Sequence, residues 1–250
     1  MCQVNFSHTF GYNGSNIGTA QDMTWGTTMA RPKNSDLLKT IENACFRSFA
    51  SCGYAETTYT KLAGESEAPR ALISYYYPKK EQLAIAFMKD VLDVCLREIR
   101  ARSAAANESL AEWFMLGQVF FQCLVDEDGF RLFALDIFNN RDLSMNSTRF
   151  CFDWSLEYLA NSHDIAIAGN SSPDHLFRIV HDLGGFYELL YFQMKNGYEP
   201  DIPVQIESLI RSFLAPYIYD KQIMEVAFKE GLLSEVLRRE IVGAVCAQYK

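Results

Sequence analysis

The chain has 250 residues, of which 49% are hydrophobic and 22% charged, so it is long enough for one or two folded domains and too apolar to be disordered throughout. No uninterrupted apolar stretch reaches the roughly 20 residues of a membrane-spanning helix, so we expect no membrane partner. The formal net charge of −8 argues against nucleic acid as a partner unless that charge is unevenly distributed.

The motifs of common enzymes and metal sites do not occur. The seven cysteines form no C-x-x-C pair and their count is odd, which indicates reduced thiols in a cytoplasmic protein rather than disulfides or a zinc site. His163, His175 and His181 lack the spacing of helical metal ligands. No nucleophile elbow, phosphate loop or dinucleotide fingerprint is found. We therefore expect no catalytic residue, no metal and no cofactor.

Residues 1–30 read as a disordered tail. They carry a single charge, Asp22, and are rich in Gly, Asn, Ser and Thr. The alternative is a tail whose aromatic side chains, Phe6, Phe10 and Trp25, dock on the folded body.

The next fifty residues predict four helices in close succession. The first, 36–52, starts at Ser35-Asp36 and is followed by Gly53, and it carries an apolar stripe at helical spacing: Leu38, Ile41, Cys45 and Phe49. A short second helix starts at Thr57 or Thr58, and a third runs from Pro69 to Tyr77, where Pro78 stops it. Two short helices around a tight turn, braced by a preceding helix, are typical of a helix-turn-helix.

The stretch from Ile41 to Leu83 resembles the DNA-binding domain of the TetR (tetracycline-repressor-like) family of transcriptional regulators. The matching elements are Ala44, Phe49, Gly53-Tyr54, Thr57-Thr58, Leu62-Ala63 and the ending Tyr75-Tyr76-Tyr77-Pro78-x-Lys80-Glu81-x-Leu83. The rest of the chain adds no family motif.

The resemblance implies a homodimer that places its third helices in successive major grooves of a palindromic double-stranded DNA operator. The residues that it assigns to DNA binding are Thr58, Lys61, Pro69, Arg70, Ala71, Ser74, Tyr75, Tyr76 and Lys80. Arg70 is the recognition-helix side chain able to make a bidentate contact to guanine. The alternatives are that Tyr75 and Tyr77 pack in the core and that Arg70 and Lys80 are solvated surface cations.

Two positions depart from the family pattern. Glu67 stands where the family usually has Gly in the turn, and if that position is left-handed, Glu costs about 1 kcal/mol or more relative to Gly. Ser74 stands where the family has a Tyr that typically contacts a phosphate.

The charge is unevenly distributed. Residues 31–83 have eight basic and six acidic side chains, a net charge of +2, whereas 84–250 carry −9 and the tail −1. The predicted DNA-binding segment is thus the net-positive one, but its excess is small, so useful affinity should require two such domains on one duplex.

Residues 84–250 read as helices throughout. The expected ranges, beginning with the fourth helix, are 79–103, 107–124, 130–138, 147–162, 174–196, 202–215 and 221–249, the last with a possible break at Gly231. Asp126-Glu127-Asp128-Gly129 reads as a solvated acidic turn. Gly184-Gly185, in the middle of 174–196, indicates either the close approach of another backbone or a bend.

Abundant aromatic residues favour a cavity for an apolar or aromatic small molecule, rather than only core packing. The predicted ligand-binding residues are Trp113, Phe120, Phe133, Trp154, Phe186 and Tyr187. By resemblance, 174–196 and 202–215 pair with their twins in a four-helix dimer interface; the alternative is that they only close the monomer core.

These observations predict an all-α protein. Residues 1–30 form the tail, 31–83 a three-helix helix-turn-helix domain, and 84–250 a helical bundle for ligand binding and dimerisation, reached through the long fourth helix. The function expected is a TetR-type regulator, a repressor in the family's usual sense, controlled by a small molecule that shifts the fourth helix. The alternative is a helical small-molecule-binding or interaction protein of the same fold with weak or lost DNA binding. The hypothesis that the chain is an enzyme is supported only by the expected aromatic cavity.

Overall fold

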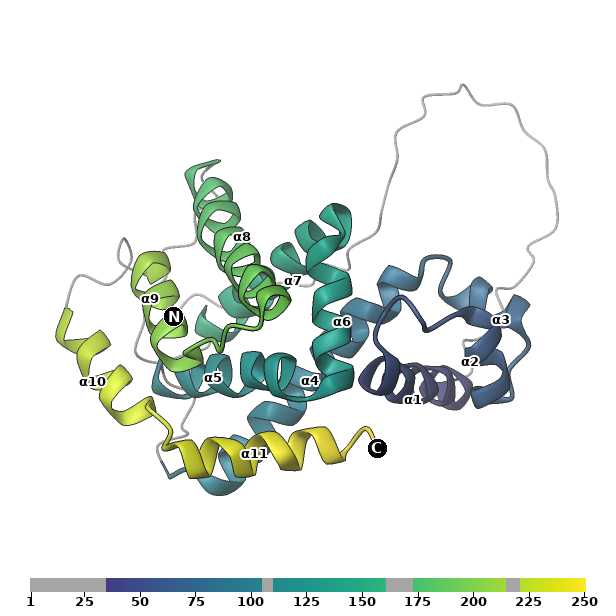
Figure 1. Ribbon diagram of the computed structural model, residues 1–250, viewed down its shortest axis with the longest axis horizontal. Coiled ribbons are helices and arrows are strands. Elements are labelled where there is room, and N and C mark those ends of the chain that lie inside the picture. The colour runs from purple at the N-terminus through teal and green to yellow at the C-terminus, as the bar shows by residue number, and fades with distance from the viewer. Residues whose placement is uncertain (1–34, 105–109, 161–172, 215–220) are drawn as a thin grey trace, which may run out of the picture. The chain divides into compact units, whose positions relative to one another are not determined.

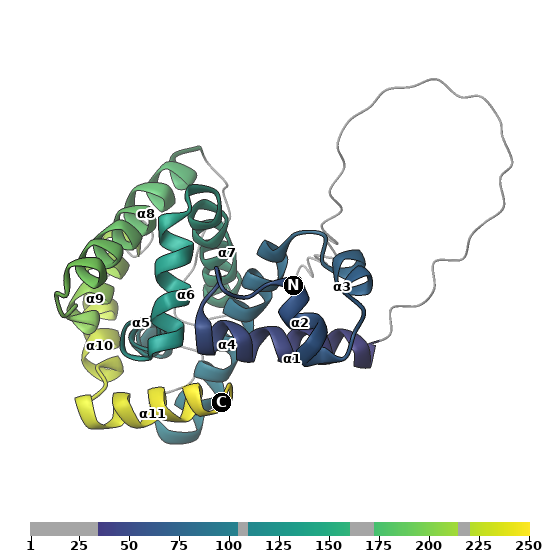
Figure 2. The same ribbon diagram turned by 45° about the vertical axis from the view of Figure 1, so that its right-hand side comes forward.

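The computed structural model describes residues 35–104, 110–160, 173–214 and 221–250, and the regular structure within these ranges is all α-helical, as predicted. The predicted tail, His163 and the turn around residue 170 lie outside the described residues. The helices, which Figures 1 and 2 show in two orientations, are α1 (Ser35–Cys52), α2 (Tyr59–Ser66), α3 (Arg70–Tyr76), α4 (Lys80–Arg102), α5 (Leu110–Asp126), α6 (Asp128–Asn139), α7 (Arg141–Ala160), α8 (Pro173–Asn196), α9 (Ile202–Leu214), α10 (Lys221–Gly231) and α11 (Glu235–Ala247).

Helix α5 is the core of the bundle. It packs against α4, α6, α9, α10 and α11, and its apolar residues surround the helix on all sides, as expected of a helix buried on every face. Two polar side chains on it are fully buried and both are paired. Glu112 accepts two hydrogen bonds from the Arg100 guanidinium, at 2.6 and 2.9 Å, and Gln118 donates to the Gly231 carbonyl at 2.8 Å.

A cluster of aromatic rings joins the N-terminal helices to the bundle. Phe49 of α1, Phe87 of α4 and Phe133 of α6 lie with ring centroids 5.0–5.7 Å apart. Tyr249, just after α11, completes the cluster against Phe87, and its hydroxyl donates to Asp90 on α4 at 2.6 Å. Helices α1, α4, α6 and α11 are therefore fixed to one another by one packed core.

The contact between α1 and α6 adds to the prediction of a solvated acidic turn, in which Asp126 and Asp128 are exposed as expected. Only Glu127 separates α5 from α6, and Gly129 is buried in the first turn of α6. A Cβ atom at Gly129 would lie 1.7 Å from the Ala50 carbonyl oxygen, so the backbones of α1 and α6 touch there. Sequence patterns do not show such a contact because it joins residues that lie far apart in the chain.

The possible break at Gly231 is confirmed: 221–249 is two helices, and just after the break the Leu233 N–H donates to the buried Gln118 side chain at 3.2 Å. Other boundaries differ in detail from the expected ranges. Helix α7 starts at Arg141, six residues earlier than expected, because the Asn140 side chain accepts from the Leu143 N–H and caps it. Helix α3 ends at Tyr76, one residue early.

Candidate functional site

The α2–α3 pair has helix-turn-helix geometry. The Thr58 side chain accepts a hydrogen bond from the Lys61 N–H at 3.2 Å, and so caps α2 as the sequence indicated. Helix α2 ends at Glu67, whose φ of 53° and ψ of 19° are left-handed. The departure at position 67 therefore carries the expected conformational cost. Pro69 then stands at the N-cap of α3, where its missing N–H costs no hydrogen bond.

Helix α3 buries one side and exposes the other. Ile73 is fully buried, and Leu72 is half-buried. Pro69, Arg70 and Ala71 are exposed, Ser74 and Tyr76 are half-buried, and Tyr75 is the most open of the three tyrosines, with 72% of its surface accessible. Core packing is thus excluded for Tyr75. Tyr77 packs inward, and its hydroxyl donates to Glu42 at 2.5 Å.

Lys61 is exposed on α2 beside a cysteine. Its ammonium lies 3.0 Å from the Cys52 sulfur and 3.9 Å from the Glu65 carboxylate. Although partial burial opposes the shift, hydrogen bonds from Lys61, Ser48 and Thr57 lower the pKa of the Cys52 thiol.

Lys80 does not stand free in solvent. Its ammonium donates to the Tyr54 carbonyl at 2.7 Å and the Thr57 carbonyl at 3.0 Å, and lies 3.9 Å from the centre of the Tyr54 ring. Burial lowers the pKa of this lysine. Two of its three N–H donors are therefore used to fix the turn between α1 and α2. The phosphate contact that the resemblance implies for Lys80 stays a prediction.

The same turn is held from a second helix. The Asp136 carboxylate on α6 accepts from the Ala55 N–H at 2.7 Å. We call residues 53–57, which are held by Lys80 from α4 and by Asp136 from α6, the clamped turn. Sequence reasoning missed Asp136, since nothing local marks an acidic residue of one helix as the partner of a turn some 80 residues earlier.

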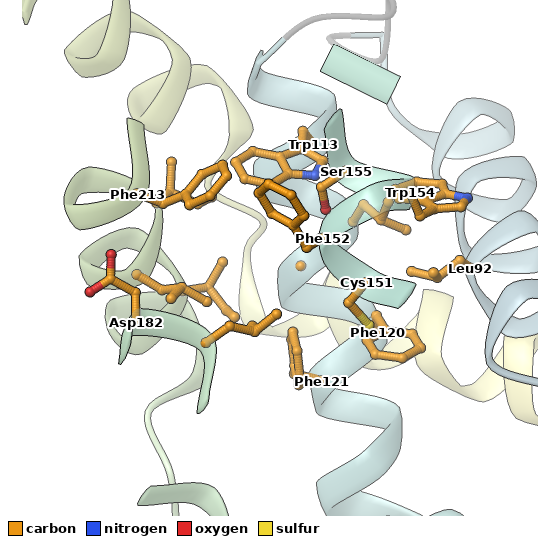
Figure 3. Close-up of a pocket in the computed structure, with 16 residues that line it drawn as sticks. Leu92, Trp113, Phe120, Phe121, Cys151, Phe152, Trp154, Ser155, Asp182 and Phe213 are labelled. Atoms are coloured by element: carbon orange, nitrogen blue, oxygen red, sulfur yellow. The ribbon is translucent and has the colours of Figure 1, made fainter. Parts of the chain in front are cut away.

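An apolar cavity lies among α5, α7, α8 and α9, with α4 contributing Leu92 (Figure 3). About 720 Å³ of space not filled by protein atoms lies within it and in the open solvent at its mouth. Its lining residues are Leu92, Trp113, Leu116, Gly117, Phe120, Phe121, Cys151, Phe152, Trp154, Ser155, Asp182, Leu183, Ile206, Leu209, Ile210 and Phe213.

Three of the six predicted ligand-binding residues line this cavity: Trp113, Phe120 and Trp154. The other three pack elsewhere. Phe133 belongs to the aromatic cluster with Phe49 and Phe87, Phe186 packs edge-on to Phe121 at 4.7 Å, and Tyr187 lies 4.6 Å from Phe138. The cavity instead takes further aromatic rings from α5, α7 and α9: Phe121, Phe152 and Phe213. Phe121, directly after Phe120, was among the abundant aromatics of the sequence, whereas the helical stripe of 202–215 indicates that Phe213 faces inward without indicating a cavity.

Helices α8 and α9 pack on each other and leave apolar side chains uncovered. Val180, Leu189 and Phe192 of α8 and Val204 of α9 are exposed. Nothing lies within 4 Å of a Cβ atom built at Gly184 or Gly185. No backbone among the described residues therefore approaches this glycine pair, and α8 continues through it as one helix.

Within the described ranges, no three metal-ligating side chains gather at one point, and no helix has the length and apolarity needed to cross a membrane.

Comparison with known proteins gives a partial structural likeness and no match in sequence. No protein-family model matches the chain, and no curated protein matches it in sequence. Among solved structures, the chain is similar to SmeT, the repressor of the Stenotrophomonas maltophilia multidrug efflux pump SmeDEF. The two share 15% identity at a TM-score of 0.44, over 79% of this chain and 95% of that one. At this distance, residue roles have to be argued from the chain's own side chains.

Proposed function

We propose that this chain is a TetR-type DNA-binding transcriptional regulator, with a repressor's mode of action, whose operator binding is controlled by a small molecule. The observation that carries the proposal is the exposed face of α3 in a capped helix-turn-helix, on a chain whose α4 also reaches an apolar cavity. Residues 31–83 serve as the DNA reader and 84–250 as the ligand-binding and dimerisation domain.

On DNA, α3 enters the major groove and Arg70 reads a base edge. Within the described residues, the Arg70 side chain has no hydrogen bond or ion pair, so its planar guanidinium is available to donate to guanine O6 and N7. Tyr75 offers an exposed ring and hydroxyl beside it. Thr58 and Lys61, at the start of α2, lie where phosphate contacts would position the domain.

The dimer forms through α8 and α9. Their exposed apolar side chains would be covered by the same surface of a second copy, as a two-fold interface requires. The uncovered glycine pair gives room for a partner helix to approach closely. The two helix-turn-helix domains of the dimer then bind the two half-sites of a palindromic operator.

Ligand binding is coupled to DNA binding through α4, because this helix carries Leu92 in the cavity wall and Lys80 at the clamped turn. A ligand that fits the cavity better in one position of α4 favours that position. It thereby favours the corresponding distance between the two helix-turn-helix domains of the dimer. The ligand acts only through this difference in affinity between the two spacings.

Selection of bound duplexes from a random DNA pool, followed by a salt series on the selected site, tests the proposal. We expect an enriched palindrome with half-site centres about one helical turn or slightly more apart, and affinity that falls steeply with salt. No enrichment, together with no binding near micromolar concentration, would instead identify a helical small-molecule-binding or interaction protein with lost DNA binding. The small positive charge of residues 31–83 and the engaged Lys80 ammonium are what favour that second candidate.

A further inference from the structure

The cavity wall is almost wholly apolar, so its few polar groups decide what it binds. Besides aliphatic side chains it is built from six aromatic rings: Trp113, Phe120, Phe121, Phe152, Trp154 and Phe213. Such a wall favours a flat aromatic body, because aromatic rings pack well against one another at offset or edge-on angles. Apart from the Trp154 indole, whose nitrogen lies on the side away from the other labelled rings in Figure 3, the polar side-chain atoms come from Cys151, Ser155, Asp182 and the Trp113 indole.

Two of these polar groups are already engaged. The Cys151 sulfur accepts a hydrogen bond from the Tyr187 hydroxyl at 3.2 Å, and burial raises the pKa of this thiol to about 11, which keeps it uncharged at neutral pH. One Asp182 carboxylate oxygen lies 2.9 Å from Nδ1 of His181. Figure 3 places Asp182 at the edge of the group, with its carboxylate turned away from the rings of Trp113 and Phe152.

The other two have no partner among the residues that the structure describes. No hydrogen bond is made there by the Trp113 indole N–H or by the Ser155 hydroxyl, although both residues line the cavity. In the view of Figure 3, the Trp113 indole nitrogen and the Ser155 hydroxyl oxygen lie near each other in projection. One is a donor only, and the other can rotate to donate, so together they suit a hydrogen-bond acceptor on the ligand.

Charge on the ligand is disfavoured. No lysine or arginine is among the described residues that line the cavity, so nothing there compensates an anion. A cation would have to be compensated by Asp182, whose carboxylate already lies 2.9 Å from His181 and points away from the rings of Trp113 and Phe152 (Figure 3). Transfer of an uncompensated charge into an apolar site costs far more than a neutral acceptor does.

We propose that the cavity binds a neutral, planar aromatic compound with one hydrogen-bond acceptor, such as a ring carbonyl, which takes hydrogen bonds from the Trp113 indole and the Ser155 hydroxyl. The inference rests on the proposed function, in that this compound is the effector of the regulator. Rings of the ligand pack among the aromatic side chains, and the acceptor selects between compounds of equal shape.

Isothermal titration calorimetry on the full chain, without DNA, tests the proposal with a matched pair of probes. 9-Fluorenone and fluorene have the same flat ring system, and only fluorenone has a carbonyl. We expect fluorenone to bind more tightly, by about threefold to tenfold for each uncharged hydrogen bond that its carbonyl accepts. Trp113→Phe and Ser155→Ala should each reduce that ratio, and Ser155→Thr, which keeps the hydroxyl, should preserve it.

Trp154→Phe is the matched control. It removes an indole from the same cavity, but Figure 3 draws the Trp154 nitrogen on the side away from the other labelled rings. The fluorenone-to-fluorene ratio should therefore survive this substitution even if both affinities fall. A ratio that Trp154→Phe abolishes and Trp113→Phe does not would overturn the assignment.

Other outcomes would also overturn the proposal. These are equal affinity for the two probes, no binding of either, or tighter binding of the cation 9-aminoacridine that Asp182→Asn abolishes. Because DNA is absent from the titration, a chain that binds fluorenone as expected but selects no DNA would refute the proposed regulator and leave the ligand assignment intact.

Discussion

Glu67 shows at the scale of one residue how a sequence departure becomes a structural cost. In the part of the chain that the structure describes, it is the one non-glycine residue with a positive φ, at 53°. Its side chain is exposed, so no packing compensates the left-handed backbone. The strain therefore lies in the turn that sets the angle between α2 and α3.

Glu67→Gly should raise the free energy of unfolding by about 1 kcal/mol, because glycine adopts the left-handed region without a Cβ clash. Urea unfolding followed by circular dichroism measures the change. Glu65→Gly is the control: it removes the same charge from the right-handed interior of α2, where glycine should cost about 0.5–1 kcal/mol. Equal effects at the two positions would mean that loss of the carboxylate, and not the backbone, governs the change.

Arg70→Ala should weaken binding to the preferred operator by about 1–3 kcal/mol and relax base preference at one position of each half-site. The affinities of the selected operator and of its single-base variants, measured by fluorescence anisotropy, give both quantities.

Arg149→Ala is the charge-matched control for Arg70, since Arg149 is exposed on α7 and pairs only weakly with Asp153 at 3.8 Å. It should leave base preference unchanged. If Arg70→Ala also leaves base preference unchanged, α3 does not read DNA through this side chain.

At the scale of helices, the contact between α1 and α6 does most to join the N-terminal helices α1–α3 to the bundle. Gly129 lets the two backbones touch, and Asp136 holds the clamped turn from the same helix. Because Gly129 and Asp136 lie two turns apart on α6, a displacement of that helix moves the end of α1 and the clamped turn together.

Gly129→Ala should lower the free energy of unfolding by about 3 kcal/mol, the upper end of overpacking costs, since the new methyl group meets the Ala50 backbone rather than a flexible side chain. Gly64→Ala provides the comparison, because nothing lies within 4 Å of a Cβ atom at that exposed position of α2. It should stabilise the protein by about 1 kcal/mol through helix propensity. Both are read from urea unfolding, and a mild effect at Gly129 would show that α1 and α6 can separate at little cost.

Local patterns were enough to predict the helices but not the positions of their side chains in the bundle. The stripe of 36–52 and the caps at Thr58 and Glu67 depend on neighbours within one or two turns, so they can be read from sequence. Whether an inward ring lines a cavity or fills the core depends on the helix opposite it. Trp113 and Phe133 both face inward, yet one lines the cavity and the other packs on Phe49. The same limit explains why the sequence offers Lys80 as a phosphate-contacting lysine or a solvated cation, whereas in the structure its ammonium donates to the Tyr54 and Thr57 carbonyls.

Across the whole molecule, two helices connect the ends of the proposed regulator. Helix α4 joins the cavity to the clamped turn through Leu92 and Lys80, and α6 holds that turn independently through Asp136. A ligand that moves α4 relative to α6 therefore changes the hydrogen bonds that Lys80 and Asp136 make to the turn. The position of α2, which follows the turn, changes as a result. In the proposed regulator, a movement in the bundle would thus reach α2 and α3 through this turn.

The glycine pair of α8 allows a test of the proposed dimer that does not disturb the monomer. Gly185 is exposed, and nothing lies within 4 Å of a Cβ atom built on it, so the chain itself has room for a side chain there. Gly185→Arg should even favour α8, since arginine exceeds glycine in helix propensity by nearly 1 kcal/mol. If a partner helix approaches this point, the bulky cation will instead block it. We therefore expect sedimentation velocity to show a dimer for the unaltered chain and a monomer for Gly185→Arg, with unfolding stability of the monomer retained. Gly243→Arg, an equally open and exposed glycine on α11, should leave the dimer intact. A dimer that persists in Gly185→Arg would move the interface away from this face of α8.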